Sequence, residues 1–432
     1  MSNAPITTEN IANPFDKSGG VAPFSGRDTE LSTLHQHLTD VKDTHATLYL
    51  GRWRIGKTAL LRNFSGFFDD TFIGIYIPLS QVDFTDDKAW LLTLFQAVDY
   101  YIKQRGITQS KQFPSLPDDE DTDLQQWFKE TFLPDTFHTI RPQRRLAILL
   151  DDVQFLIEAV DKGQLSDDTF AYLHSLMDAQ LGIALTLPVD NENDVDKLAP
   201  LIISTQIRRL SNLTLDATKS LFRETLPTME IASIERVFAS TGGNPYVLQR
   251  FGYHLHETRD EAITQSERVQ QIHSLLNREQ HNYFLSIWKN LTQNERFVLT
   301  ALSGLLYENP IQQITPITIE KWLVETEYLM DTTAINAVLR SLEYREIVQL
   351  KDGVIQFVAT LMRDWIIEHA QINVNQTHTE NQTPKRIVWV LVALFIIVLF
   401  GLLLIISESN TANDNSQESA PPTVTIVPPN NG

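Results

Sequence analysis

Short apolar runs alternate with longer amphipathic stretches along the first half of the chain. Helical patterns, such as the one at 88–103, lie between these runs. Uninterrupted apolar runs are typical of strands buried on both faces of a parallel sheet. The alternation therefore predicts an α/β domain with a parallel sheet from about residue 21 to residue 214. The runs, rich in Leu, Ile and Val, cover 47–51, 72–79, 145–152 and 182–188.

Downstream of this domain the pattern becomes helical. Residues 215–291 predict a helical lid, interrupted by the Gly-Gly-Asn-Pro sequence that starts at Gly242. Residues 292–371 predict three helices followed by a short hairpin, which is the order found in a winged-helix domain. Polar composition predicts a disordered N-terminal tail at 1–20 and a linker at 372–386.

Residues 387–406 form an unbroken apolar run of 20 residues. As a helix this run would span roughly 30 Å, the thickness of a bilayer core, so it predicts one transmembrane helix. The alternative is a buried core helix, which usually carries some polar positions. Lys385 and Arg386 precede the run, and the polar tail at 407–432 has no Lys or Arg. The positive-inside rule then predicts a single-pass cell-membrane protein with cytoplasmic N-terminal domains and a disordered outer tail.

The composition narrows the classes of function. The chain has no cysteine, which excludes disulfide scaffolds, Cys-based zinc sites and thiol nucleophiles. Its formal net charge is −19. Proteins that bind nucleic acid usually present a basic surface, because contacts with phosphates dominate their affinity. The acidity therefore argues against nucleic acid as the main partner.

The strongest motif follows the first predicted strand and matches G-x-x-x-x-G-K-[ST] in full. Its glycines allow a tight loop whose N–H groups face one point, and the helix after it adds its positive end. Lys57 would reach the β- and γ-phosphates of ATP, and the Thr58 hydroxyl would bind Mg²⁺. The predicted nucleotide contacts are Gly51, Arg52, Trp53, Arg54, Ile55, Gly56, Lys57, Thr58 and Ala59.

Two carboxylates end the third predicted strand, about 100 residues after this loop. Asp151 would hold Mg²⁺, and Asp152 would orient or deprotonate the attacking water, with Lys57 as the second catalytic residue. The alternative is a strand followed by an Asp-Asp turn or a helix N-cap.

These motifs together resemble the STAND class of AAA-related P-loop NTPases, close to the origin-recognition-like branch. The segment that starts at Pro23 looks like the F-x-G-R-x-x-E-L box, and the one that starts at Arg54 is similar to R-x-G-K-T-S-L-L. The strand that ends at Asp152 fits the Walker B motif. The segment that starts at Thr241 resembles T-G-G-x-P-x-x-L of the lid, and the one that starts at Gln206 looks like the last strand of the core.

The resemblance implies further site residues. Phe24, Gly26 and Arg27 would lie near the nucleotide base, and Pro245 of the lid would contact the nucleotide. The sequence departs from the family pattern in two places, which puts rapid turnover in doubt. No polar sensor is clear, although Thr186 is the best candidate. No arginine finger stands out either, and the residues that could serve are Arg208 and Arg209.

These inferences predict a membrane-anchored switch protein that binds ATP, hydrolyses it slowly and couples its nucleotide state to a protein partner or to self-association. The family implies a role in signalling or defence. Three alternatives stay open: an ATPase that energises a membrane or secretion assembly, a DNA-tethering protein similar to origin-recognition factors, and a binding module without catalysis. A DNA reader would use Arg340, Arg345 and Lys351, but the acidic residues around them favour a packing role.

Overall fold

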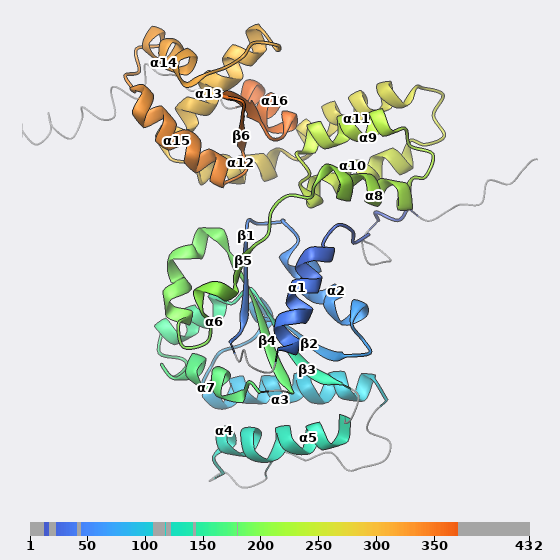
Figure 1. Ribbon diagram of the computed structural model, residues 1–432, viewed down its shortest axis with the longest axis vertical. Coiled ribbons are helices and arrows are strands. Elements are labelled where there is room, and N and C mark those ends of the chain that lie inside the picture. Colours follow the sequence, from blue (N-terminus) through green and yellow to red (C-terminus); the bar gives the residue numbers. More distant parts are fainter. Residues whose placement is uncertain are drawn as a thin grey trace, which may run out of the picture.

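The computed structural model describes two bodies of the chain, an α/β core and a helical half (Figure 1). The chain passes from one to the other around residues 210–214, after the last strand of the core. The described residues are 13–16, 23–40, 45–106, 117, 122–140, 144–178 and 180–369.

A five-stranded parallel sheet forms the centre of the core, with strand order β2-β3-β4-β1-β5. This confirms the α/β class and the parallel sheet predicted from the apolar runs. Because the strands are parallel, β1, β3 and β4 end at the same edge of the sheet, which brings Gly51, Asp151 and Pro188 together. The strands are β1 (Thr47–Gly51), β2 (Phe72–Pro78), β3 (Arg145–Asp151), β4 (Leu181–Pro188) and β5 (Ile207–Arg209).

Helices cover both faces of the sheet, so alternate residues of each strand enter different cores. In β1, Leu48 and Leu50 pack with α3, α6 and α7, whereas Tyr49 packs with α1 and α2 on the other face. Both sets of side chains are buried, which is why the strands read as uninterrupted apolar runs. The helices are α1 (Asp28–Thr39), α2 (Lys57–Phe67), α3 (Asp87–Gln104), α4 (Leu124–Trp127), the π-helical turn η3 (Phe128–Phe132), α5 (Leu133–Ile140), α6 (Gln154–Asp161) and α7 (Thr169–Leu176).

The helical half contains the lid, 215–291, and a C-terminal unit, 292–369. The lid is built from α8 (Leu215–Thr225), α9 (Ile231–Thr241), α10 (Pro245–Glu257), α11 (Gln265–Glu279) and α12 (His281–Lys289). The C-terminal unit is built from α13 (Gln293–Glu308), α14 (Pro316–Glu325), α15 (Thr332–Tyr344), the hairpin β6 (Val348–Lys351) and β7 (Val354–Phe357), and α16 (Thr360–His369). Capping boxes begin α11 and α13. The Thr264 and Thr292 hydroxyls accept from the main-chain N–H of the N3 glutamate, and the carboxylate of that glutamate accepts from the main-chain N–H of the threonine.

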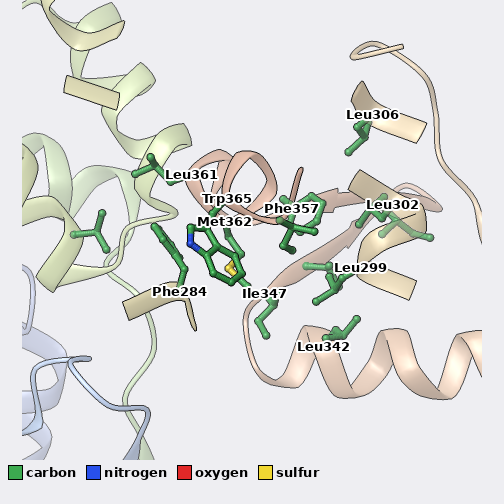
Figure 2. Packing of buried hydrophobic residues seen from close by; sticks show 14 of the residues in the cluster. Phe284, Leu299, Leu302, Leu306, Leu342, Ile347, Phe357, Leu361, Met362 and Trp365 are labelled. Atoms are coloured by element: carbon green, nitrogen blue, oxygen red, sulfur yellow. The ribbon is translucent and has the colours of Figure 1, made fainter. Parts of the chain in front are cut away.

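The lid and the C-terminal unit share one hydrophobic core. Figure 2 shows Phe284 of α12 beside Trp365 and Met362 of α16, with Ile347, Phe357 and the helices α13 and α15 continuing the same cluster. The rings of Phe284 and Trp365 have centroids 6.2 Å apart. The winged-helix assignment of 292–371 stays a prediction.

The N-terminal segment at 13–16 differs from the disordered tail expected over residues 1–20. Phe15 is 3% exposed and belongs to the core of the lid, where its ring lies 6.1 Å from that of Phe222. Asn13 donates to the main-chain oxygen of Tyr253 and to the Glu257 carboxylate. A single large apolar side chain therefore fixes a segment whose composition is otherwise polar.

The predicted fold class is wrong in including a transmembrane helix. Within the part of the chain that the structure describes, no helix is both long enough and apolar enough to cross a bilayer. The reason is visible in α3, an 18-residue helix that buries one face and carries charged residues such as Asp99 and Lys103 on the other. The expected span at 387–406 lies outside the described residues, and the cell-membrane location, which depends on it, stays a prediction.

Candidate functional site

The loop between β1 and α2 is shaped by residues at positive φ. Gly56 has φ +99°, and Arg54 has φ +63°. At the start of the loop, a Cβ on Gly51 would lie 2.6 Å from Cγ2 of Ile55, so a larger residue would force the loop open. The two glycines therefore permit a tight turn directly before the first residue of α2.

The N-terminus of α2 is a suitable place for an anion. Gly56, the N-cap residue, offers no side chain to the free N–H groups of the first turn, and that turn contains no acidic residue. Lys57 is only 7% exposed, and its Nζ donates to the main-chain oxygens of Gly51, at 3.0 Å, and Arg52, at 3.3 Å. Burial lowers the pKa of the Lys57 ammonium, against the opposing influence of Asp152, Asp151 and Asp190. A phosphate would replace neutral carbonyls with a charged acceptor.

Asp151 lies at the end of β3 with both carboxylate oxygens engaged. The Thr186 hydroxyl donates to Oδ1 at 2.6 Å, and the Tyr76 hydroxyl donates to Oδ2 at 2.8 Å. Thr186 also accepts from the N–H of Asp152 at 2.8 Å, so one hydroxyl fixes both acidic residues. The structure thus places the candidate sensor Thr186 directly at the acidic pair. Burial and the Asp151 carboxylate raise the pKa of the Tyr76 hydroxyl, which keeps it protonated as a donor.

Asp152 is held in the left-handed region, with φ +62°, and is half-buried. Burial and the neighbouring Asp151 raise the pKa of the Asp152 carboxyl, and Lys57 opposes this rise. The mutual influence of Lys57, Asp151 and Asp152 means that the predicted catalytic and metal residues share one charge environment.

Two polar side chains, those of Thr58 and Asp151, could bind Mg²⁺ together with nucleotide phosphates. The described residues contain no cluster of three or more His, Cys, Asp or Glu side chains suited to a metal ion. Mg²⁺ usually takes one or two protein carboxylates and completes its shell with phosphates and water. Asp151 at the strand end and Thr58, the second residue of α2, match that limited donor set.

The box before α1 supports the loop from behind. Arg27 is 4% exposed and donates to the main-chain oxygens of Ile55, at 3.0 Å, and Ser211, at 2.8 Å. Gly26, at φ +75°, packs so closely on α8 that a Cβ would lie 2.3 Å from that of Ala217. Phe24 packs on Phe67, with ring centroids 5.8 Å apart. Arg27 thus ties the loop to the segment that connects the core to the lid, a role that the motif did not specify.

The lid motif also reaches this loop. Asn244 caps α10 by accepting from the Val247 N–H at 3.2 Å, and Pro245 is the first residue of that helix. A Cβ on Gly56 would lie 3.8 Å from Cγ of Pro245, which places this proline beside the glycine that precedes Lys57. The predicted lid contact is therefore next to the predicted phosphate site.

The side chains at the tip of the loop contact the helical half. The Arg54 guanidinium lies 4.1 Å from the ring centroid of Trp53 and 3.9 Å from that of Tyr246 in α10. Arg52 pairs with Glu346, in the turn after α15, at 3.1 Å. Sequence reasoning missed Tyr76 and Glu346, which belong to no motif, and Tyr246, which occupies a variable position of the T-G-G-x-P-x-x-L segment.

The other candidates are engaged elsewhere. Arg208 donates to the main-chain oxygen of Thr205, and Arg209 lies 3.5 Å from the ring centroid of Tyr344 in α15. Arg345 donates to the main-chain oxygen of Asn290, whereas Arg340 and Lys351 are exposed.

Comparison with known proteins places the fold. No protein-family model matches the sequence, and no curated protein matches it. A Walker-type ATPase of Pyrococcus abyssi is similar over 79% of this chain and 95% of its own, with 17% identity and a TM-score of 0.50. Weaker likenesses are Cdc6p from Pyrobaculum aerophilum (15% identity, 83% of this chain and 98% of its own, TM-score 0.38) and a Pyrococcus horikoshii STAND protein with a tetratricopeptide repeat sensor (16%, 84% and 46%, TM-score 0.32). The chain has the fold of a P-loop ATPase.

Proposed function

We propose that the chain is an ATP-binding switch that hydrolyses ATP slowly and couples its nucleotide state to a protein partner or to self-association. The observation that carries the proposal is the buried Lys57, which lies at an uncapped helix N-terminus beside the Asp151 and Asp152 carboxylates. A buried cation needs a compensating anion, and the ordinary partner at this place in a P-loop fold is a phosphate chain.

The residues would divide the chemistry as follows. Lys57 and the N–H groups of the loop would bind phosphate oxygens, and Thr58 and Asp151 would hold Mg²⁺, which would neutralise charge on the phosphates. Asp152 would accept a hydrogen bond from the attacking water and orient or deprotonate it. Thr186 and Tyr76 keep the Asp151 carboxylate in one orientation.

We expect slow turnover because the candidate arginines are engaged with partners other than a phosphate. A P-loop ATPase gains much of its rate from a guanidinium that stabilises charge on the transferred phosphate. Arg208 and Arg209 bond to Thr205 and Tyr344 instead, and Arg52 bonds to Glu346. A partner that supplied or released an arginine would accelerate the reaction, which suits a regulated role in signalling or defence.

The lid provides the means of coupling. Pro245 lies beside Gly56, and Arg54 stacks on Tyr246. Nucleotide bound in the loop would therefore also affect the position of α10. A ligand shifts an equilibrium between two arrangements only by its difference in affinity for them. ATP and ADP differ by one phosphate at the loop, and this difference would select between arrangements of lid and core.

The proposal is tested by calorimetric titration of ATP into the full-length protein and its Lys57→Ala variant. We expect ATP binding to weaken by about 2–4 kcal/mol, because a charge-assisted contact in a desolvated site is lost. Lys162→Ala is the control, since Lys162 forms an exposed pair with Glu158 on α6. Equal affinity of Lys57→Ala and wild type would refute the assignment of the site.

A further inference from the structure

We infer that Glu346 is a positioning residue that sets the preference for ATP over ADP, because its carboxylate and the terminal phosphate of ATP compete for Arg52. When the phosphate takes Arg52, the C-terminal unit loses its ion pair with the core and separates from it. This inference rests on the proposed function and adds to it the residue through which the C-terminal unit responds to the nucleotide.

The contact between Arg52 and Glu346 joins the phosphate loop to the C-terminal unit. Nη2 of Arg52 lies 3.1 Å from Oε2 of Glu346 and 3.1 Å from Oδ1 of Asn212. The main-chain N–H of Asn212 also donates to the Glu346 carboxylate, at 3.2 Å. The side chains of Arg52 and Glu346 are only 19% and 25% exposed, so the pair is better shielded than an ordinary surface ion pair.

Glu346 adopts a backbone conformation that a glutamate rarely takes. Its φ is +52°, in the left-handed region usually occupied by glycine after a helix. A non-glycine residue there is strained, because its Cβ comes close to the following carbonyl oxygen. The contacts of its carboxylate with Arg52 and Asn212 give a reason why a glutamate stands at this turn. Strain of this kind is typical of positions that take part in a change of state.

Arg52 is coupled to the phosphate site through its own main chain. Its carbonyl accepts from Nζ of Lys57 at 3.3 Å. The Lys57 ammonium has three N–H donors, so it can also donate to a phosphate, and the arrival of a phosphate chain brings several negative charges to the loop. A guanidinium binds phosphate oxygens in a bidentate manner, so a terminal phosphate is a strong competitor for Arg52.

The contacts between the core and the C-terminal unit are of a kind that can be broken without exposing a shared hydrophobic core. Among the described residues, the buried apolar cluster of the helical half is distinct from the two clusters of the core. Two further contacts across this surface are polar: Arg209 donates to the Tyr344 carbonyl at 2.7 Å, and the Tyr344 hydroxyl donates to Glu192 at 2.7 Å. A cavity of about 400 Å³ lies beside them, lined by residues that include Arg52, Asp190, Ser341 and Tyr344. Polar pairs around a cavity can be exchanged for water with little loss of apolar burial.

The test uses the absence of native cysteine, which allows two labels to be placed on the full chain without further changes. Asp167→Cys in the core and Ala337→Cys on α15 are both exposed positions for spin labels. Distances between them are measured without nucleotide, with ATP and with ADP, while calorimetry gives both affinities. The series compares wild type, Glu346→Gln, the charge exchange Arg52→Glu with Glu346→Arg, and Glu343→Gln. Glu343 is the matched control, because its carboxylate contacts the Leu350 N–H within the C-terminal unit.

We expect Glu346→Gln to populate the long distance without nucleotide and to raise the affinity for ATP about three- to tenfold, with little change for ADP, as loss of a competitor worth about 1 kcal/mol predicts. The charge exchange should restore the short distance, which a merely structural effect of either substitution would not do. Glu343→Gln should match wild type.

Two different failures can be distinguished. If wild type binds no ATP, the proposed function and the competition both fail, and the nucleotide-free distances still decide whether Arg52 and Glu346 hold the units together. If wild type binds ATP but Glu346→Gln changes neither the distance nor the ratio of the ATP and ADP affinities, the inference is overturned and the proposed function stands.

Discussion

The C-terminal unit has two interfaces of opposite character. Toward the lid it shares a continuous hydrophobic cluster, in which Trp365 and Phe284 are almost fully buried (Figure 2). Toward the core it contacts the phosphate loop through an ion pair and β5 through a stacked arginine, with a cavity beside these contacts. An interface that buries apolar surface resists separation, whereas one made of polar groups can exchange its partners with water or ligand. The lid and the C-terminal unit should therefore move as one body relative to the core.

Removal of apolar volume from the first interface should have the largest effect. Trp365→Ala leaves a cavity in the shared cluster and removes the hydrogen bond from its Nε1 to His281, so we expect a loss of about 3–5 kcal/mol in the free energy of unfolding. Urea unfolding followed by circular dichroism should show the helical half melting before the core. Tyr307→Ala, at a residue that is 71% exposed, should be nearly neutral. A loss of less than 1 kcal/mol for Trp365→Ala would contradict the idea of a single rigid body.

A variant that binds ATP without hydrolysing it should show, in one experiment, how the lid and the C-terminal unit each respond to the nucleotide. Asp152→Asn keeps the size of the side chain but cannot act as a base, so we expect binding of ATP with hydrolysis reduced at least about 100-fold. Hydrogen exchange should then show that ATP protects residues 240–250 of the lid and exposes residues 344–347, and that ADP does so less. Equal patterns with ATP and ADP would mean a nucleotide-binding protein without a switch.

Removal of one hydroxyl from a buried polar network inside the core should lower the free energy of unfolding more than removal of a contact at the polar interface. Thr186→Val removes the hydroxyl that donates to Asp151 and accepts from the Asp152 N–H. Both groups lose a partner in a dry site, so we expect a loss of about 1–3 kcal/mol in the free energy of unfolding of the core. Thr186→Ser should keep most of the stability. If valine is tolerated as well as serine, the network contributes nothing measurable.

The smallest effect is expected at the polar interface itself. Arg209→Ala removes the stack on Tyr344 and a hydrogen bond that is partly exposed, together worth about 0.5–1 kcal/mol. The population with the longer spin-label distance should rise about two- to fivefold. Arg340→Ala, at an exposed position of the same α15, is the control. If Arg209→Ala lowered the free energy of unfolding as much as Trp365→Ala does, the two interfaces would not differ in the kind of contact that stabilises them.

The fold could be predicted from the sequence wherever burial produces a pattern of apolar residues. Strands β1 and β4 coincide closely with the apolar runs at 47–51 and 182–188, because every position of these strands is covered by a helix on one face or the other. Strand β5, with three half-buried residues at the sheet edge, leaves no such pattern and was found only through its resemblance to a family. Phe15 was missed because one buried side chain in a polar segment produces no period.

Only those site residues that belong to sequence motifs could be predicted from the sequence. The chain places Lys57, Asp151 and Asp152 together, as the phosphate-loop and strand-end patterns predicted, although their roles stay predictions. Tyr76 could have been found by its position two residues before the end of β2, since parallel pairing aligns that end with Asp151. Glu346 could not, because it is separated from Arg52 by 294 residues and follows a helix whose pattern reflects only its own packing.

The burial of Phe15 gives the helical half a second tether. The chain crosses between lid and core once around residues 210–214 and once between Asp16 and Pro23, whose neighbours Phe15 and Phe24 are packed in different bodies. Seven peptide units can span at most about 25 Å, so the second crossing limits how far the two bodies can part. A movement that only exchanges the polar contacts of the C-terminal unit for water or ligand stays within this limit.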